Sequence, residues 1–438
     1  MCRYFYFCFH FVLLPFNKLN RLVYLFSSLH KMDEDNSVSE EEEIVDIYQE
    51  HKSLLEAIDN HNCALVHDLV HNKGLCPNIN VDGQTPICRA AQVGFVDILD
   101  ILVEGGCSLF TADADIWRRQ ALHIAASKGH IEFARRLLEY GADVNTRDDD
   151  ERTPLHWAAT YGNPLMASFL LNVGAAVNIA QCDGFTPLHA ATCLGHNNVC
   201  KVLLEHGAEI NRTDRDGWSP FHTAVCYGHK EVVQTLLEAG ASLTKLTNDE
   251  ENVVHIAASS GKLDVLKLTL DYGADLNALT MSGSTPFYLS IYYGEFEVVR
   301  YFIKIGADMY VTNGPKKTPF YLAAAKCHMP IMFLMMEGGY NLSCEEWVLQ
   351  KEFPQVLHKL PEFCNLLYRV GANPRSLKNL SRFRIRNAIK YDTDFENSLN
   401  SLQLPSCLKE YISYSDLDGI GKTSITASTD TPPAVGWL

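Results

Sequence analysis

Residues 183–214 read DGFTPLHAATCLGHNNVCKVLLEHGAEINRTD, and imperfect copies of this stretch fill the middle of the 438-residue chain. The position held by Thr186 recurs after one interval of 35 residues and then every 33 residues. Its occupants are Thr85, Gln120, Thr153, Thr186, Ser219, Asn252, Thr285 and Thr318. Two glycine positions recur with the same spacing, so three markers share one register. A fixed period of this length predicts an array of stacked structural repeats.

Each repeat is expected to contain a turn followed by two short helices. Gly184 favours a tight turn because glycine readily adopts a positive φ angle. Thr186 can cap the first helix, and Pro187 suits its first position, where a missing N–H costs no hydrogen bond. Gly195 is expected to end the first helix and Gly207 the second. Neither helix can bury its apolar stripe alone, so neighbouring repeats must stack.

The Thr-Pro-Leu-His signature with a period of 33 residues resembles the ankyrin repeat. The resemblance implies an all-α solenoid, built from helix-turn-helix units with β-turn fingers, over residues 49–344. Residues 1–48 are predicted to form an N-terminal extension that is disordered or in part a non-native upstream segment, and residues 345–373 capping helices and a linker. A small helical domain at 374–414 and a disordered tail at 415–438 complete the predicted organisation.

Composition narrows the class of partner and the compartment. The formal charge of −16 argues against nucleic-acid binding and against docking on an anionic membrane, because both require a basic surface. None of the 14 cysteines forms a CxxC pair, and several fall inside repeat helices. Buried free thiols are typical of a reducing compartment, so we expect a cytoplasmic protein, with the nucleus as the other such compartment.

The first 31 residues differ in character from the remainder. Residues 4–16 form an apolar run that is shorter than the roughly 20 residues needed to span a bilayer. The acidic stretch after Met32 is typical of a cytosolic start. We therefore expect residues 1–31 to be an upstream extension absent from the working protein. A signal anchor is the alternative.

Histidine and cysteine stand four residues apart in two repeats, at His189 and Cys193 and at His222 and Cys226. This spacing suits a zinc site on a helix. Both histidines occupy the last position of the repeat signature. The resemblance to ankyrin repeats implies that an imidazole there ties neighbouring repeats together, so packing is the favoured interpretation. No nucleophile–base arrangement or phosphate-binding glycine loop is apparent. We expect no metal, no cofactor and no catalysis.

The C-terminal region carries a second pattern, PRSLKNLSRFRIR at 374–386 and LQLPSCLKEYI at 402–412. A unit of about 40 residues has too little core to be stable alone, which predicts a partner. The pattern resembles a SOCS box that follows ankyrin repeats. The resemblance implies a substrate-recognition subunit of a cullin–RING ubiquitin ligase, with elongin B/C and cullin 5 as partners. It assigns elongin binding to Leu377, Leu380, Ser381 and Ile385, and cullin binding to Leu402, Leu404 and Pro405.

Two residues depart from the SOCS-box pattern. Ser381 stands where the family has cysteine, and Gln403 stands where the cullin segment has its first proline. Serine keeps the size of cysteine but buries a hydroxyl group, which costs about 1–3 kcal/mol without a partner. The alternative function is therefore an ankyrin scaffold or inhibitor that has lost elongin binding.

The repeat family binds its targets through the fingers and inner helices, so the target site is expected at variable positions there. Large side chains at these positions are either exposed and target-binding, which we favour, or buried between repeats. Acidic fingers beside them predict a target segment with apolar anchors and nearby lysine or arginine. The expected target-binding residues are Tyr161, Phe185, Leu194, Trp218, Tyr227, Tyr293, Asp216 and Asp249.

Overall fold

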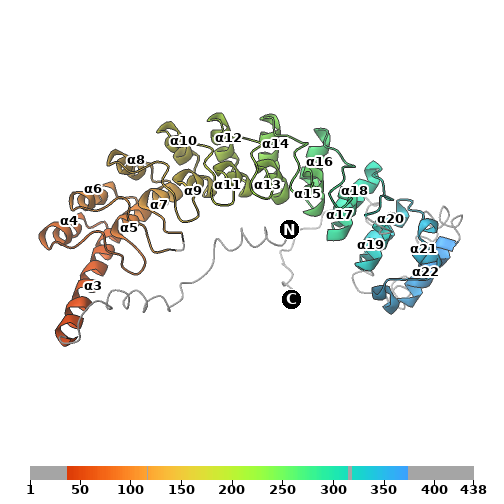
Figure 1. Ribbon diagram of the computed structural model, residues 1–438, viewed down its shortest axis with the longest axis horizontal. Coiled ribbons are helices and arrows are strands. Elements are labelled where there is room, and N and C mark those ends of the chain that lie inside the picture. Colours follow the sequence, from red (N-terminus) through yellow and green to blue (C-terminus); the bar gives the residue numbers. More distant parts are fainter. Residues whose placement is uncertain (1–36, 116, 314–317, 373–438) are drawn as a thin grey trace, which may run out of the picture. The chain divides into compact units, whose positions relative to one another are not determined.

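The structure is a computed structural model, and it describes residues 37–115, 117–313 and 318–372 (Figure 1). The apolar run at 4–16 and the SOCS-box-like segment lie outside these residues. Within the described ranges, every helix is too short or too polar to cross a bilayer. The described residues divide into two compact units. Unit 1 comprises the described residues up to Ala224 together with Gln234–Ala241, and unit 2 comprises Val225–Val233 and the described residues from Ser242 onward.

The regular elements of the described residues are helices, apart from two isolated bridges in fingers. Unit 1 contains α3 (Ser37–Asp59), α4 (Cys63–His67), the π-helical turn η1 (Asp68–Asn72), α5 (Pro86–Val93), α6 (Val96–Glu104), α7 (Ala121–Lys128), α8 (Ile131–Glu139), α9 (Pro154–Thr160), α10 (Pro164–Asn172), α11 (Pro187–Cys193) and α12 (Asn197–Glu205). Parts of α13 (Pro220–Tyr227) and α14 (Lys230–Glu238) belong to each unit.

Unit 2 continues the same alternation and then departs from it. Its helices are α15 (Val253–Ser259), α16 (Leu263–Asp271), α17 (Pro286–Tyr293), α18 (Phe296–Ile305), α19 (Pro319–Ala325), α20 (Met329–Glu337), η2 (Leu342–Cys344), α21 (Glu346–Leu349), η3 (Gln355–Lys359) and α22 (Pro361–Ala372). Within each unit, the first helices of successive repeats lie side by side in one layer and the second helices in another (Figure 1). The helical solenoid predicted from the 33-residue period is confirmed.

The residues that the sequence assigned to helix ends take those positions. Thr186 caps α11 and its hydroxyl oxygen accepts a hydrogen bond from the His189 backbone N–H, with Pro187 at the first helical position. Gly195 follows with a φ of +76°, in the left-handed region that favours glycine. Leu194 is the C-cap residue of this helix. Leu188 is buried in the layer between neighbouring repeats.

A ladder of signature histidines ties successive repeats together where the signature keeps its histidine. In α9, α11 and α15 the N-cap backbone N–H donates to imidazole Nδ1, which places the ring proton on Nε2. Nε2 then donates across the repeat boundary. The bonds run from His156 to the Phe185 carbonyl at 3.2 Å, from His189 to the Trp218 carbonyl at 3.1 Å, and from His255 to the Ser284 carbonyl at 3.1 Å. The packing interpretation of these histidines is confirmed.

The last repeat is covered by η2, α21, η3 and α22, and a buried carboxylate joins this cover to it. Glu345 is 1% exposed and accepts hydrogen bonds from the Tyr340 hydroxyl and from Trp347 Nε1, the latter at 2.5 Å. The ring of Tyr340 stacks on Phe320 of α19 with centroids 5.1 Å apart. This end of unit 2 is therefore closed by aromatic packing around one charged group.

Candidate protein-binding surface

Two of the predicted target-binding residues in unit 1 stand exposed at the ends of inner helices. Tyr161 is the C-cap residue of α9 and is 53% exposed, and Leu194 is the C-cap residue of α11 and is 43% exposed. Phe185, in the finger before α11, is half-buried with its ring centroid 4.9 Å from that of His189. These side chains leave apolar surface available to a partner.

Trp218 is buried, and its assignment as an exposed target anchor is therefore wrong. Only 9% of the residue is exposed. Its backbone N–H donates to Asp214 Oδ1 at 2.8 Å, its carbonyl accepts from His189, and its ring packs edge-on against His222. The indole fills space between repeats, which was the alternative interpretation of aromatic fingers.

Unit 1 contains an aromatic and cationic cluster that the repeat pattern did not indicate. The Arg119 guanidinium lies 5.2 Å from the ring centroid of Trp117 and 4.8 Å from that of Trp157. Its Nε donates to Asp115 Oδ2 at 2.6 Å. Trp157 is buried and also stacks on the exposed Tyr161 with centroids 6.1 Å apart. The buried Trp157 ring thus supports the exposed Tyr161 ring.

The single 35-residue interval before Gln120 marked this finger as irregular, although it did not indicate which side chains meet there. The two additional residues of that interval fall in the finger that contains Trp117 and Arg119. The Trp117 carbonyl also accepts a hydrogen bond from Asp149 in the following finger at 2.9 Å. An irregular spacing in an otherwise regular array was therefore the mark of a distinctive finger.

Unit 2 presents a second group of predicted residues. Tyr293 is 43% exposed at the end of α17, and its ring lies edge-on to the equally exposed Tyr292. The Lys326 ammonium nitrogen sits 4.0 Å from the ring centroid of Tyr292. Tyr227 is half-buried and its ring stacks with that of His229. The exposure expected of the predicted target-binding residues is found at Tyr293 and only in part at Tyr227.

The two acidic residues of the predicted site are exposed at finger tips. Asp216 lies in unit 1 and Asp249 in unit 2. The Asp249 carbonyl accepts from the Met281 backbone N–H at 3.3 Å, which brings the 70% exposed Met281 side chain to the neighbouring finger. An apolar side chain beside a carboxylate suits a segment that carries apolar and basic residues.

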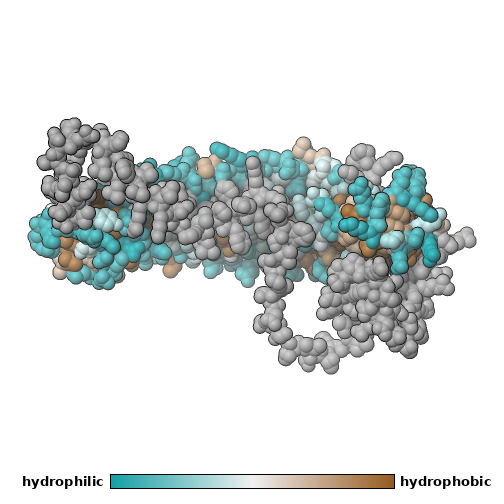
Figure 2. Space-filling view, turned by 90° about the horizontal axis from the view of Figure 1, so that it is seen from below, coloured by the Kyte–Doolittle hydropathy of each residue, from teal (hydrophilic) through white to brown (hydrophobic). Residues whose placement is uncertain are grey.

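The visible surface of the described residues is mainly hydrophilic, with apolar areas among the polar residues (Figure 2). On the face drawn in Figure 2, hydrophilic residues cover most of the visible described surface, with brown apolar areas between them. Apolar residues on this face are thus set among polar neighbours (Figure 2).

His189 has no nitrogen available for a metal. Its Nδ1 accepts from the Thr186 backbone N–H at 3.1 Å, and its Nε2 donates to the Trp218 carbonyl. Burial lowers the pKa of this imidazole to about 4, because the charged form would lose its hydration. The histidine–cysteine spacing in this helix therefore reflects repeat packing.

Comparison with protein families accounts for most of the chain. The family described as ankyrin repeats (3 copies) matches residues 54–148, 146–214, 221–313 and 254–346. The SOCS box family matches residues 373–413, directly after the last residue of α22. The predicted elongin-binding residues and cullin-binding residues all fall within this second match and lie outside the described residues.

Curated relatives match over short segments only. Alpha-latrocrustotoxin-Lt1a of Latrodectus tredecimguttatus is 34% identical over 109 residues, which are 24% of this chain and 7% of the toxin. Inversin of Mus musculus is 33% identical over 98 residues, 22% of this chain and 9% of inversin. The E3 ubiquitin-protein ligase Ufd4 of Drosophila melanogaster is 34% identical over 105 residues, 24% of this chain and 4% of the ligase. The chain therefore spans less than a tenth of each of these relatives.

Proposed function

The chain belongs to the ankyrin repeat and SOCS box proteins, and we propose from this premise that it is the substrate-recognition subunit of a cullin–RING ubiquitin ligase. Family membership makes it a protein-binding adaptor of the SOCS-box type. In the proposed complex the SOCS box binds elongin B/C and cullin 5, while the ankyrin repeats hold the target for ubiquitination and degradation. The chain itself carries no catalytic step, and we place it in the cytoplasm, with the nucleus as a second location.

The observation that supports this proposal most directly is the order of the two modules. The SOCS box match begins at residue 373, one residue beyond α22. Within the described residues, the cover built on Glu345 follows the last repeat and precedes the match to the box. A protein-binding array followed by a SOCS box is the module order that the proposed adaptor needs, with the target on the repeats and the ligase on the box.

The target side of the proposal rests on side chains that are exposed but supported. In unit 1 these are Tyr161, backed by Trp157, together with Leu194 and the half-buried Phe185. In unit 2 they are Tyr293 at the end of α17 and the Asp249 carboxylate on the finger of the preceding repeat. Supported aromatic rings lose little side-chain entropy on binding, which suits them as anchors for a target segment.

Ser381 and Gln403 favour the second candidate function, an ankyrin scaffold or inhibitor without a ligase. A buried, unpartnered hydroxyl at Ser381 would weaken elongin binding by roughly 10- to 100-fold. A loss of this size reduces the occupancy of the SOCS box but leaves specific binding measurable at micromolar concentration. We therefore favour the ligase subunit over the scaffold.

Cullin recruitment separates the two candidates. The full-length chain is immobilised and incubated with purified cullin 5, with and without elongin B/C. The ligase subunit retains cullin 5 only when elongin B/C is present, and a Leu404→Ala, Pro405→Ala double variant retains elongin B/C but less cullin 5. A chain that retains no cullin 5 in the presence of elongin B/C at micromolar concentration would be a scaffold.

A further inference from the structure

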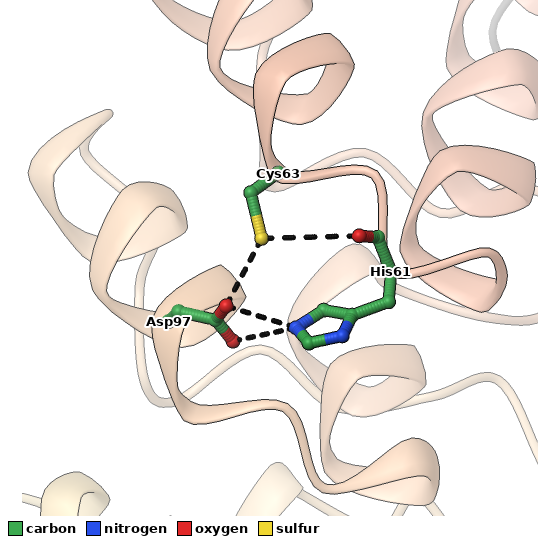
Figure 3. A group of neighbouring side chains, drawn as sticks. All are labelled: His61, Cys63 and Asp97. Atoms are coloured by element: carbon green, nitrogen blue, oxygen red, sulfur yellow. Dashed lines mark hydrogen bonds and ion pairs between the residues drawn. The ribbon is translucent and has the colours of Figure 1, made fainter.

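Three side chains with different donor atoms meet at the surface of unit 1: His61, Cys63 and Asp97 (Figure 3). Asp97 Oδ2 lies 2.8 Å from His61 Nε2 and 3.1 Å from Cys63 Sγ. The three ligand atoms all lie within 4.8 Å of one another. One carboxylate oxygen therefore faces both an imidazole nitrogen and a thiol sulfur.

Local structure holds each of the three side chains in place. His61 occupies the turn between α3 and α4 with a φ of +51°, and its ring stacks on Phe95 at a centroid distance of 3.8 Å and an interplanar angle of 7°. Cys63 is the first residue of α4, and Asp97 lies in the first turn of α6. The helices α4 and α6 pack against each other, which brings residues from two successive repeats to one point.

We propose that His61, Cys63 and Asp97 form a zinc-binding site that joins α4 to α6. Nitrogen, sulfur and carboxylate oxygen are the donor atoms that Zn²⁺ prefers, at bond lengths of about 2.0–2.3 Å. In tetrahedral geometry these bonds place a nitrogen and an oxygen about 3.3 Å apart, and a sulfur and an oxygen about 3.6 Å apart. Each contact of Asp97 must therefore open by only about half an ångström to admit the ion.

The proton balance of metal binding is simple at this site. Without metal, the Cys63 thiol and the His61 Nε2–H both donate to the Asp97 carboxylate. Zinc binding releases the thiol proton to solvent and moves the imidazole proton to Nδ1, which leaves Nε2 free to coordinate. The dication then takes the place of both hydrogens between the same three atoms.

The donor set also selects among metals. A thiolate and an imidazole suit Zn²⁺ and its probe Co²⁺, whereas Mg²⁺ and Ca²⁺ prefer oxygen ligands alone. The His61 and Asp97 side chains are 45% and 54% exposed, so the fourth coordination position faces solvent and takes a water molecule. Zinc would thereby act as a surface staple between the first two helical pairs of unit 1.

Co²⁺ titration of the full-length, reduced chain tests the proposal, because a cobalt–thiolate bond gives its own charge-transfer absorption. The proposal predicts one Co²⁺ per chain with this absorption, displaced by one equivalent of Zn²⁺. Cys63→Ser removes the absorption, while Cys76→Ser, which removes an exposed thiol outside the cluster, retains it. Absence of the absorption in the wild-type chain, or its persistence in Cys63→Ser, overturns the proposal.

Two further variants test the other ligands by competition for Zn²⁺ with a coloured chelator. Asp97→Asn and His61→Asn are expected to weaken Zn²⁺ binding by at least about tenfold, since loss of even an outer partner costs that much. Asparagine at position 61 tolerates the positive φ angle, so folding is preserved. His71→Asn is the control, because the His67 and His71 rings lie 4.6 Å apart and offer a competing pair. Weaker binding in His71→Asn with unchanged binding in His61→Asn would place the ion at His67 and His71 and would overturn the proposal.

Discussion

The imidazole Nε2 of His189 lies 3.1 Å from the carbonyl oxygen of Trp218, 29 residues further along the chain. The same ring accepts the Thr186 backbone N–H through Nδ1, so one side chain caps its own helix and bonds the next finger. Stacking of the repeats therefore depends on directional hydrogen bonds as well as on apolar burial.

Replacing His189 by alanine should lower the free energy of unfolding by about 1–3 kcal/mol, because it leaves the buried Thr186 backbone N–H without its partner and removes the bond to the Trp218 carbonyl of the next repeat. That carbonyl keeps its other hydrogen bond, from the Asp214 backbone N–H at 2.9 Å. Urea denaturation followed by circular dichroism measures the change. His206→Ala is the matched control, since this exposed ring bonds only to the Val202 carbonyl of its own helix. Equal losses of stability in the two variants would contradict a stabilising role for the hydrogen bonds of the signature histidines.

Stability should fall on mild acidification. Burial lowers the pKa of His123 to about 4 and of His156 to about 3, from an ordinary value of 6.5. Below pH 6.5 the unfolded chain binds protons on these rings that the folded chain does not, so the free energy of unfolding decreases as the pH falls toward 4. Above pH 6.5 both states keep these imidazoles neutral, so the full stability of the folded chain is retained.

Urea midpoints at pH 7.5, 6 and 5, at constant ionic strength, measure this dependence. A His156→Gln variant should be less stable at pH 7.5 and should lose less stability than the wild-type chain on going to pH 5. Parallel pH dependence of the two proteins would show that the buried imidazoles are not responsible.

The repeat architecture was predictable because its signals are local. Threonine caps, prolines at the first helical position and glycines with positive φ act through the backbone within a few residues of one another. The signature histidines could be assigned for the same reason. Whether a finger side chain is buried depends instead on how the neighbouring repeats pack. Trp218 was therefore predicted to be exposed, whereas it is buried.

Alanine substitutions should distinguish buried from exposed aromatic residues. Trp218→Ala is expected to lower the free energy of unfolding by about 3 kcal/mol, because it opens a cavity between repeats. Tyr161→Ala should cost about 1 kcal/mol or less, since the ring is half-exposed and loses mainly its stacking on Trp157. Chemical denaturation of the two variants tests the contrast, and similar losses of stability would mean that Trp218 is not a packing residue.

The cover of the last repeat should depend on the Glu345 carboxylate. Glu345→Gln removes the charge from two buried hydrogen bonds, to Tyr340 and Trp347, and should destabilise unit 2 by about 1–3 kcal/mol. Tryptophan fluorescence during urea denaturation reports the loss, with Glu352→Gln, an exposed carboxylate on the same segment, as control. Glu345→Gln with wild-type stability would contradict a role for this carboxylate.

Two groupings lay beyond the reach of the sequence because their members are distant in the chain. His61 precedes α4 and Cys63 begins it, whereas Asp97 lies in α6, 34 residues beyond Cys63. Arg119, in the finger before α7, meets Trp157 of α9 only because the two repeats pack together. Periodicity predicts which helices are neighbours, but it does not predict which variable side chains on them meet.

Titration of the full-length chain with purified elongin B/C in a calorimeter tests the central claim most directly. The account predicts saturable one-to-one binding that is lost in a Leu377→Ala, Ile385→Ala variant. It also predicts that Ser381→Cys binds roughly 10- to 100-fold more tightly than the wild-type chain, because the buried hydroxyl is removed. Absence of heat with both the wild-type chain and Ser381→Cys at micromolar concentration would contradict the assignment of this adaptor to a ubiquitin ligase.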